Sequence, residues 1–94
     1  MLPELNPLIH SQLRLSIMTL LAVVAEADFS YLRERTQATA GNLSVQLDKL
    51  SRAGYIQLTK EFVGKKSHTT CRLTDEGRRA LEEYVAALKC YLNL

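Results

Sequence analysis

Short hydrogen-bonding side chains and basic side chains are interleaved with leucines in residues 39–56, "TAGNLSVQLDKLSRAGYI". At 100° per residue the leucines of a helix here fall on one stripe, which we expect to face the core: Leu43, Leu47 and Leu50, with Ala40 beside them. The other side starts with small and amide residues and becomes basic towards Lys49 and Arg52. Glycine inside a helix costs roughly 1 kcal/mol relative to alanine, so helix stability alone does not explain this polar start.

Entry into the major groove of DNA explains the pattern, because the first turns of a recognition helix come close to base edges. Glutamine and asparagine can read adenine through paired hydrogen bonds, Val45 can touch a thymine methyl, and Lys49 and Arg52 suit phosphates. The residues of this helix predicted to contact DNA are Thr39, Gly41, Asn42, Ser44, Val45, Gln46, Lys49 and Arg52. On the helix alone, a solvated face with a few polar residues is an equal alternative.

A second basic group follows in a predicted β-hairpin. The runs "YIQLTKEF" and "TTCRL" alternate apolar and polar residues on either side of the turn "VGKKSH". The basic residues of this hairpin can grip the sugar-phosphate backbone or enter a minor groove. They are Lys60, Lys65, Lys66, His68 and Arg72. A lysine-rich solvated turn is the alternative, and the position directly after a recognition-like helix favours DNA binding.

The charge of the 94 residues is distributed unevenly. The net charge is +2, but residues 31–73 hold eight Lys or Arg against three Asp or Glu, a net +5. Such a concentration is expected of a protein that meets a polyanion. The chain shows no signal-peptide pattern, no apolar run of membrane length and two cysteines outside any CxxC pair. We therefore predict a cytoplasmic protein without membrane contact.

The elements that must position these residues are predicted in the order helix, helix, helix, strand, strand, helix. A short second helix, from about Tyr31 to Gln37 and capped by Asp28 or Ser30, leads directly to the helix capped by Thr39. Two helices joined by so few residues form a helix-turn-helix, and the hairpin after them makes it a winged helix. Gly54 is expected to close the third helix in the left-handed conformation.

The predicted fold class is α+β, mainly helical: a winged helix-turn-helix with a three-helix core, a β-hairpin wing and a C-terminal dimerisation helix. We expect a single winged-helix DNA-binding domain over residues 1–94. Its predicted parts are a first helix at 8–25, the helix-turn-helix at 30–53, the wing hairpin at 55–73 and the C-terminal helix at 74–93.

Two helices carry more apolar surface than one small domain can cover. The first is apolar almost all the way round, and the last has two apolar stripes, the second of which includes Ala87, Tyr91 and Leu94. A homodimer is therefore predicted, and which face of each helix forms the interface is left open. The predicted interface residues are Leu8, Ile9, Leu13, Ile17, Leu81, Tyr84, Val85, Leu88, Tyr91 and Leu92.

Over nearly its whole length the chain resembles the MarR/ArsR-like winged-helix transcription regulators, especially the short stand-alone kind. "IHSQLRLSIMTLL" is similar to the first helix of that family, "FSYLRERTQATAGNLSVQLDKLSRAGYI" to its helix-turn-helix and "GKKSHTTCRLTDEGRRAL" to its wing and last helix. The resemblance implies a homodimer that binds a pseudo-palindromic site in double-stranded DNA and represses or activates transcription. It implies base-reading positions at Asn42, Ser44, Val45 and Gln46, with Lys65 and Lys66 in the wing. MarR-type wings often carry arginine at the tip, which suits a narrow minor groove better than lysine.

Other functions are weighed against this one. His68 and Cys71 have an HxxC spacing and Cys90 is a third soft ligand, so a metal- or redox-responsive regulator is one alternative. Cys71 stands at an inward position, however, which favours an inert core residue, and we predict no metal site and no cofactor. His10 is expected to be a structural or dimer-surface residue. The chain lacks a glycine-rich phosphate loop, a nucleophile elbow and a zincin motif, so no enzyme is predicted. A winged helix that serves only as a protein-interaction module is the remaining rival.

Overall fold

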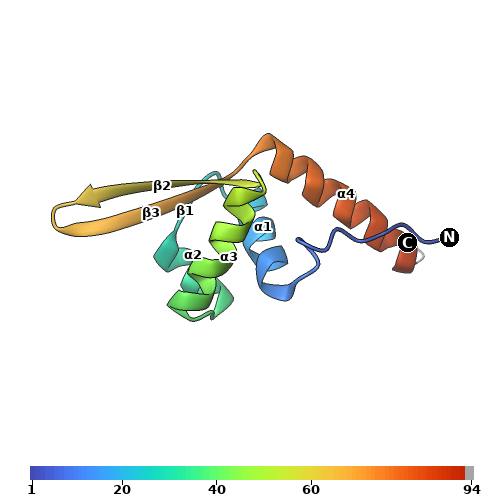
Figure 1. The fold of residues 1–94 in the computed structure, drawn as a ribbon, viewed down its shortest axis with the longest axis horizontal. Helices are drawn as coiled ribbons and strands as arrows, with labels where there is room; N and C mark the ends of the chain where they lie inside the picture. The colour runs from blue at the N-terminus through green and yellow to red at the C-terminus, as the bar shows by residue number, and fades with distance from the viewer. Residues whose placement is uncertain (93–94) are drawn as a thin grey trace.

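The computed structural model describes residues 1–92, which form four helices and a three-stranded sheet (Figure 1). The elements are α1 (Gln12–Val23), β1 (Ala27–Asp28), α2 (Phe29–Thr36), α3 (Ala40–Arg52), β2 (Ile56–Val63), β3 (Lys66–Leu73) and α4 (Asp75–Leu92). The sheet is antiparallel with the strand order β1-β3-β2. Three helices, a hairpin and a last helix make a winged helix, so the predicted fold class is confirmed.

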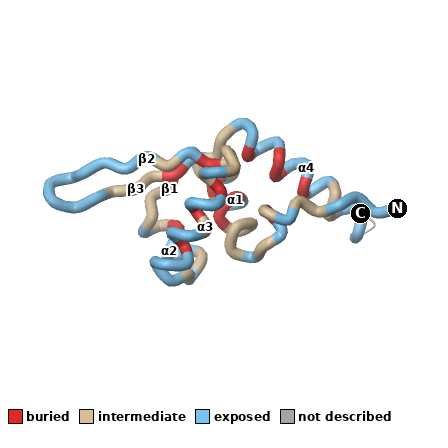
Figure 2. Tube along the Cα trace, viewed as in Figure 1, coloured by how far each residue is buried: buried red, intermediate tan, exposed pale blue. Residues whose placement is uncertain are grey.

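The molecule is elongated, with principal-axis extents of 54 × 25 × 21 Å. The β2–β3 hairpin projects at one end, α4 and the N-terminal segment lie together at the other, and α1, α2 and α3 lie between them (Figure 1). Burial is concentrated in this middle part, whereas the outer hairpin and the far turns of α4 are exposed (Figure 2). The shape therefore consists of one helical core with two extensions.

Apolar side chains from α1, α2, α3 and the base of the sheet form the core. Those with at most 2% exposure are Ile9, Ile17, Met18, Leu21, Leu32, Leu43, Leu47, Leu50, Ile56 and Cys71. The inward stripe predicted for the three leucines of α3 is confirmed. Ala40, expected beside them, is exposed, because it lies in the first turn of α3, where Gly41 and Asn42 are exposed as well.

α1 is shorter than the helix predicted at 8–25. Ser11 is its N-cap, with extended backbone, and its hydroxyl accepts the N–H of Arg14 at 3.4 Å. The residues before it form a turn in which the side chain of Asn6 accepts the N–H of Leu8. At the other end Val24 is extended, and the chain enters β1 three residues later. The apolar pattern overestimated the helix because residues before Ser11 reach the core from a turn.

Side-chain caps set the geometry of the helix-turn-helix. Asp28 accepts the N–H of Tyr31 at 2.7 Å, so α2 begins directly after this aspartate. Gln37 ends α2 in the left-handed conformation, at φ 61°. Thr39 then accepts the N–H of Asn42 at 3.1 Å and starts α3. The turn between the two helices is thus fixed by local hydrogen bonds at both ends.

The hairpin lies at the predicted residues, but its strands are longer and its turn is tighter than the sequence indicated. Pairing runs from Ile56 opposite Leu73 to Val63 opposite Lys66. The turn is Gly64–Lys65, with Gly64 at φ 67°, a conformation that glycine adopts without strain. The predicted turn "VGKKSH" is therefore mostly strand. The two-residue β1, which pairs with β3, was not predicted because two residues show no alternation.

The chain approaches itself closely where the hairpin joins α3 and α4. The carbonyl of Tyr55 accepts the N–H of Thr74 at 3.0 Å. The hydroxyl of Thr74 donates to the carbonyl of Gly54 at 2.6 Å and accepts the N–H of Gly77 at 3.0 Å. Gly54 has φ 81°, in agreement with the predicted left-handed closure of α3. Thr74 thus caps α4, as expected. The predicted last helix ends at residue 93, and residues 93 and 94, including Leu94, lie outside the described residues.

Gly77 should tolerate no side chain. A Cβ at this position would overlap the carbonyl oxygen of Tyr55 and lie 3.0 Å from a methyl carbon of Leu73. We expect Gly77→Ala to lower the free energy of unfolding by about 2 kcal/mol or more, measured by urea denaturation. Gly41→Ala is the matched control, because an added Cβ there meets nothing within 4 Å. Equal stability of the two variants would contradict the close approach.

Candidate nucleic-acid interface

α3 presents polar side chains outward because its leucines are held in the core. Gln46 is half-buried, whereas the other α3-region residues predicted to contact DNA are exposed: Thr39, Gly41, Asn42, Ser44, Val45, Lys49 and Arg52. Val45 is an apolar exception on this surface, with 51% of the residue exposed. The structure therefore makes the predicted recognition surface accessible along the whole helix.

One cation of α3 is engaged within the helix. Arg52 Nε lies 3.0 Å from a carboxylate oxygen of Asp48, one turn earlier, and both side chains are largely exposed. An exposed i,i+4 pair contributes only about 0.3–0.5 kcal/mol to stability. Arg52 can therefore exchange this partner for another anion at small cost.

Gln46 is held by a residue that the sequence did not single out. Arg14 of α1 donates from Nη1 to Gln46 Oε1 at 2.5 Å, and Gln46 Nε2 donates to Asn42 Oδ1 at 3.0 Å. The signal was present, because Arg14 is the one Lys, Arg, Asp or Glu between residues 5 and 25. A lone cation in an otherwise apolar helix needs a partner, and here the partner lies 32 residues away in sequence.

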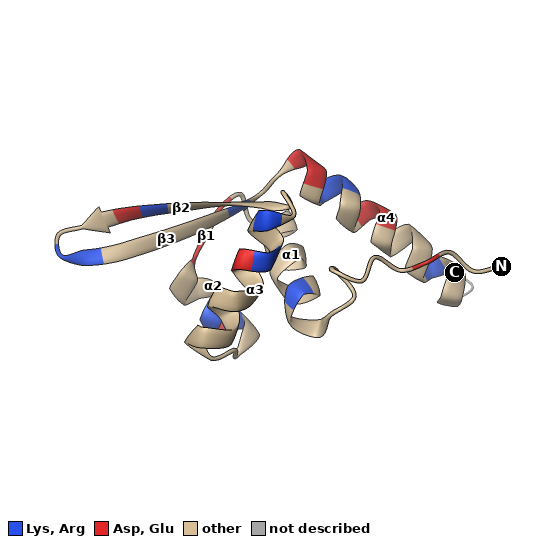
Figure 3. Ribbon diagram, viewed as in Figure 1, with Lys and Arg blue, Asp and Glu red and all other residues tan. Residues whose placement is uncertain are grey.

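The basic residues of the hairpin do not share one face. Leu58 opposite Cys71 marks the face towards the core, and Lys60 opposite Thr69 shares that face by the two-residue period of the strands. Arg72 pairs with Gln57 and so lies on the other face. Lys65 occupies the turn and Lys66 the first position of β3, so both lysines stand at the exposed end of the hairpin (Figure 3).

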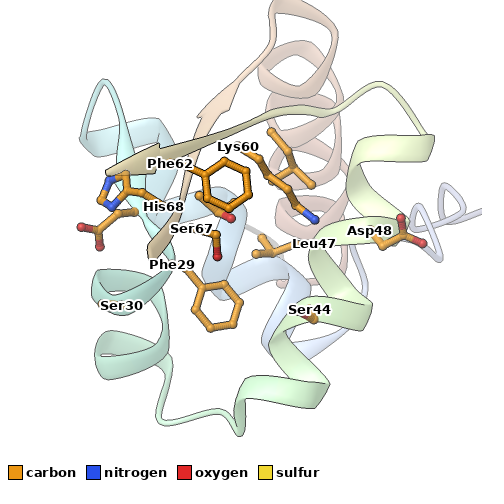
Figure 4. A pocket seen from close by; sticks show the side chains of 12 residues that line it. Phe29, Ser30, Ser44, Leu47, Asp48, Lys60, Phe62, Ser67 and His68 are labelled. Carbon is orange, nitrogen blue, oxygen red and sulfur yellow. The ribbon is translucent and has the colours of Figure 1, made fainter. Parts of the chain in front are cut away.

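An open groove separates the hairpin from the two helices of the helix-turn-helix. Its volume is about 630 Å³, and Ser44 and Asp48 of α3, Phe29 of α2, and Lys60 and Phe62 of β2 are among its lining residues. Figure 4 shows the side chains of Phe29, Lys60 and Phe62 around this space. Part of the predicted recognition helix and part of the predicted wing thus border the same concave surface.

Two exposed apolar residues at the end of the hairpin were not predicted as functional. Phe62 is 78% exposed and Val63 is 66% exposed, next to Lys65 and Lys66. Exposed apolar residues beside cations suit a ligand with both charge and apolar surface, as DNA offers in its sugars and base edges. Strand alternation alone would place Phe62 inward, so its exposure could not be expected from the sequence.

His68 and Cys71 cannot act together as metal ligands. They are three residues apart in β3, and an odd separation puts their side chains on opposite faces of a strand. Burial, followed by the charge of Asp28, raises the pKa of the Cys71 thiol to about 11, so the thiol is protonated at neutral pH. Within residues 1–92 no three His, Cys, Asp or Glu side chains are grouped to hold a metal ion.

His10 has a structural contact. Its Nδ1 lies 2.8 Å from the hydroxyl oxygen of Tyr84 in α4, which ties the turn before α1 to the last helix. Tyr91 of the same helix donates to the carbonyl of Pro3 at 2.5 Å. The N-terminal segment is thereby attached to α4 over much of its length.

Four of the ten residues predicted for a dimer interface are already covered by their own chain. Ile9 and Ile17 are 0% exposed, and Leu81 and Tyr84 are 8% and 4% exposed. These four are corrected to core residues, because the N-terminal turn, α1 and α4 pack on one another. Leu8, Leu13 and Leu88 are half-buried. The predicted residues with substantial free surface are Val85, Tyr91 and Leu92, on the outer half of α4.

The comparison with known families decides what this architecture is. A winged helix DNA-binding domain model matches residues 13–92. The chain belongs to this family. An uncharacterized protein of Methanocaldococcus jannaschii is 32% identical over 76 residues, which are 81% of this chain and 83% of that protein. The prediction of a winged-helix DNA-binding domain is thereby confirmed, and the ArsR-like part of the resemblance stays a prediction.

Solved structures agree with the family. A transcriptional regulator homologue of Pyrococcus horikoshii OT3 superposes with a TM-score of 0.83 at 26% identity, covering 92% of this winged-helix chain and 85% of that chain. Bacillus subtilis PadR in complex with operator DNA superposes with a TM-score of 0.65 at 22% identity, covering 74% and 44%, and shows the shared fold alone. Among the helices of residues 1–92, none has the length and apolar character needed to cross a membrane.

The two thiols should differ sharply in reactivity. Cys71 is buried with a raised pKa, whereas Cys90 is exposed on α4. At pH 8 we expect an aromatic disulfide reagent to titrate one thiol rapidly in the folded protein and two in denaturant, because the thiolate is the nucleophile. Cys90→Ser should abolish the rapid phase. A rapid phase that survives this substitution would mean that Cys71 is accessible.

Proposed function

We propose that this winged-helix protein is a homodimeric, sequence-specific transcriptional regulator. In this proposal α3 enters the major groove of double-stranded DNA, and the β2–β3 hairpin contacts the backbone or the adjacent minor groove.

The accessible polar surface of α3 beside a basic hairpin is the observation that carries the proposal. Asn42, Ser44 and Val45 are exposed in the first half of α3, and Lys49 and Arg52 are exposed in the second half. Amide and apolar groups suit base edges, and cations suit phosphates. The order along the helix therefore matches a recognition helix whose N-terminal turns lie deepest in the groove.

The hairpin supports a second contact on the DNA. The predicted wing residues are Lys60, Lys65, Lys66, His68 and Arg72, and all but the half-buried His68 are exposed. Their strand register divides them between the groove beside α3 and the outer face. We propose that Lys65 and Lys66 contact phosphates of the DNA. Lys60 would meet the sugar-phosphate backbone of the DNA strand that passes between the hairpin and α3. His68 and Arg72 would contact the edges of the same site.

The outer half of α4 supports a homodimer. Val85, Tyr91 and Leu92 are 40%, 41% and 56% exposed, and Leu2 of the adjoining N-terminal segment is 54% exposed. Several exposed apolar side chains at one end of a small domain are typical of a subunit interface. A two-fold axis at this end leaves both α3 helices outside the interface, as needed for two half-sites about one DNA turn apart. A DNA-bound role also agrees with the predicted cytoplasmic location, which stays a prediction.

Salt-dependent binding tests the DNA contact. We expect labelled mixed-sequence duplex DNA to bind in fluorescence anisotropy with a strong loss of affinity as salt rises. Lys65→Ala/Lys66→Ala removes two lysines from each subunit of the proposed dimer. It should make the slope of log K against log salt shallower by up to about 3.6, since each lost phosphate contact removes about 0.9.

The matched control is Arg78→Ala/Arg79→Ala, which removes two exposed charges from α4, outside the residues proposed to contact DNA. This variant should keep the wild-type slope. Equal changes of this slope in both double variants would mean that it follows the net charge of the protein and not contacts made by the hairpin. A folded dimer that binds no duplex DNA at low salt would contradict the proposal and favour a protein-interaction module.

Glutamate substitutions on α4 test the proposed dimer interface. Val85→Glu/Leu92→Glu should convert the protein to monomers of 10.6 kDa in sedimentation velocity, because two carboxylates on each subunit would be buried without partners. Val23→Glu, at an 86% exposed position at the end of α1, should leave the dimer intact. A wild-type protein that is monomeric at micromolar concentration would contradict the proposed assembly.

A further inference from the structure

A chain of three hydrogen-bonded side chains leads from α1 to the outer surface of α3. Arg14 Nη1 donates to Gln46 Oε1 at 2.5 Å, and Gln46 Nε2 donates to Asn42 Oδ1 at 3.0 Å. Arg14 is itself anchored, because its Nε donates to the carbonyl of Leu8 at 2.5 Å. Arg14 and Gln46 are half-buried, and Asn42 at the end of the chain is exposed.

The chemistry of the guanidinium group gives this chain one direction. Arginine has five N–H donors and no acceptor, so the oxygen of Gln46 must be the end that faces Arg14. The amide nitrogen of Gln46 then necessarily faces Asn42. Because that nitrogen only donates, the oxygen of Asn42 must face Gln46, and the Nδ2 group of Asn42 is left pointing away from the chain. Neither amide can be reversed without placing two donors against each other.

The exposed end of the chain therefore offers hydrogen-bond donors. Among the side-chain hydrogen bonds of residues 1–92, the Nδ2 group of Asn42 donates none, and its Oδ1 is turned towards Gln46, from which it accepts. A paired reading of adenine needs a donor and an acceptor from one amide, because adenine presents N7 as acceptor and N6 as donor. Guanine presents two neighbouring acceptors, N7 and O6, and suits a group that only donates.

We propose that Arg14 is a positioning residue for base recognition: by fixing the orientation of Gln46 and through it Asn42, it makes the first turns of α3 select guanine over adenine. The inference rests on the proposed function. It replaces the recognition of adenine that the sequence predicts for these two amides with recognition of guanine. Arg14 acts from behind the helix and contacts the base only through Gln46 and Asn42. The base-contacting group is the Nδ2 of Asn42.

Selection from a randomised duplex pool, followed by sequencing of the bound DNA, tests the preference. We expect the wild type to select guanine at one base pair of each half-site by roughly tenfold over adenine, within the range for one specific base contact. Arg14→Met keeps an unbranched stem but removes all donors, so both amides can reverse and the preference at that base pair should fall to about twofold or less. Arg78→Met removes the same charge from α4 and should leave the selected sequence unchanged.

Gln46→Glu gives a reciprocal test. A carboxylate keeps the contact with Arg14 but only accepts, so Asn42 must turn its Nδ2 inward and present Oδ1. The preference at the same base pair should then move from guanine towards a base with a donor, the N6 of adenine or the N4 of cytosine. Total affinity falls because of the added negative charge, and the relative frequencies in the selected pool are therefore the readout.

The outcomes separate this inference from the proposed function. Failure of the wild type to bind any duplex would overturn the proposed function, and the base preference with it. Specific binding whose preference is the same in wild type, Arg14→Met and Gln46→Glu would overturn the inference alone. A structural readout is independent of DNA: the side-chain amide resonances of Gln46 and Asn42 should shift together in Arg14→Met and not in Arg78→Met, and unshifted resonances would also overturn it.

Discussion

The crossing of the chain at Tyr55 and Thr74 is the constraint on which the rest of the structure depends. At this point the ends of β2 and β3, the end of α3 and the start of α4 meet within a few hydrogen bonds. The hairpin leaves the crossing in one direction and α4 in the other (Figure 1). The proposed DNA-contacting hairpin and the proposed dimer surface are therefore oriented by the same joint, and Gly77 is glycine because the joint leaves no space for a Cβ.

Much of the local structure was predictable because its causes are local. The leucine stripe of α3, the caps at Thr39 and Thr74 and the left-handed Gly54 each follow from residues within one or two turns, and the structure agrees with them. The order of elements and the winged-helix fold follow from these parts, since a short connection between helices and a hairpin after them leave few arrangements.

Contacts between distant residues were not predictable from periodicity. Burial of Ile9 from a turn, the pairing of β1 with β3 and the bond from Arg14 to Gln46 all depend on tertiary packing. The same limit explains the interface residues that became core: an apolar stripe indicates that a face is covered, and it does not say by which chain. A spacing such as HxxC likewise indicates nothing until the element is known, because a strand separates what a loop could bring together.

The outer half of the hairpin is held mainly by its own strand pairing, which makes it the part of the fold that opens most easily. Residues 59–67 are all exposed, so this part of the ladder is held by backbone hydrogen bonds that water can replace and by little buried apolar area. Such a segment opens locally at a free energy well below that of global unfolding. Its amides should lose hydrogen-exchange protection before those near Ile56 and Cys71, which are packed in the core. The end of the hairpin can thus change its shape locally while the crossing at its base keeps its direction.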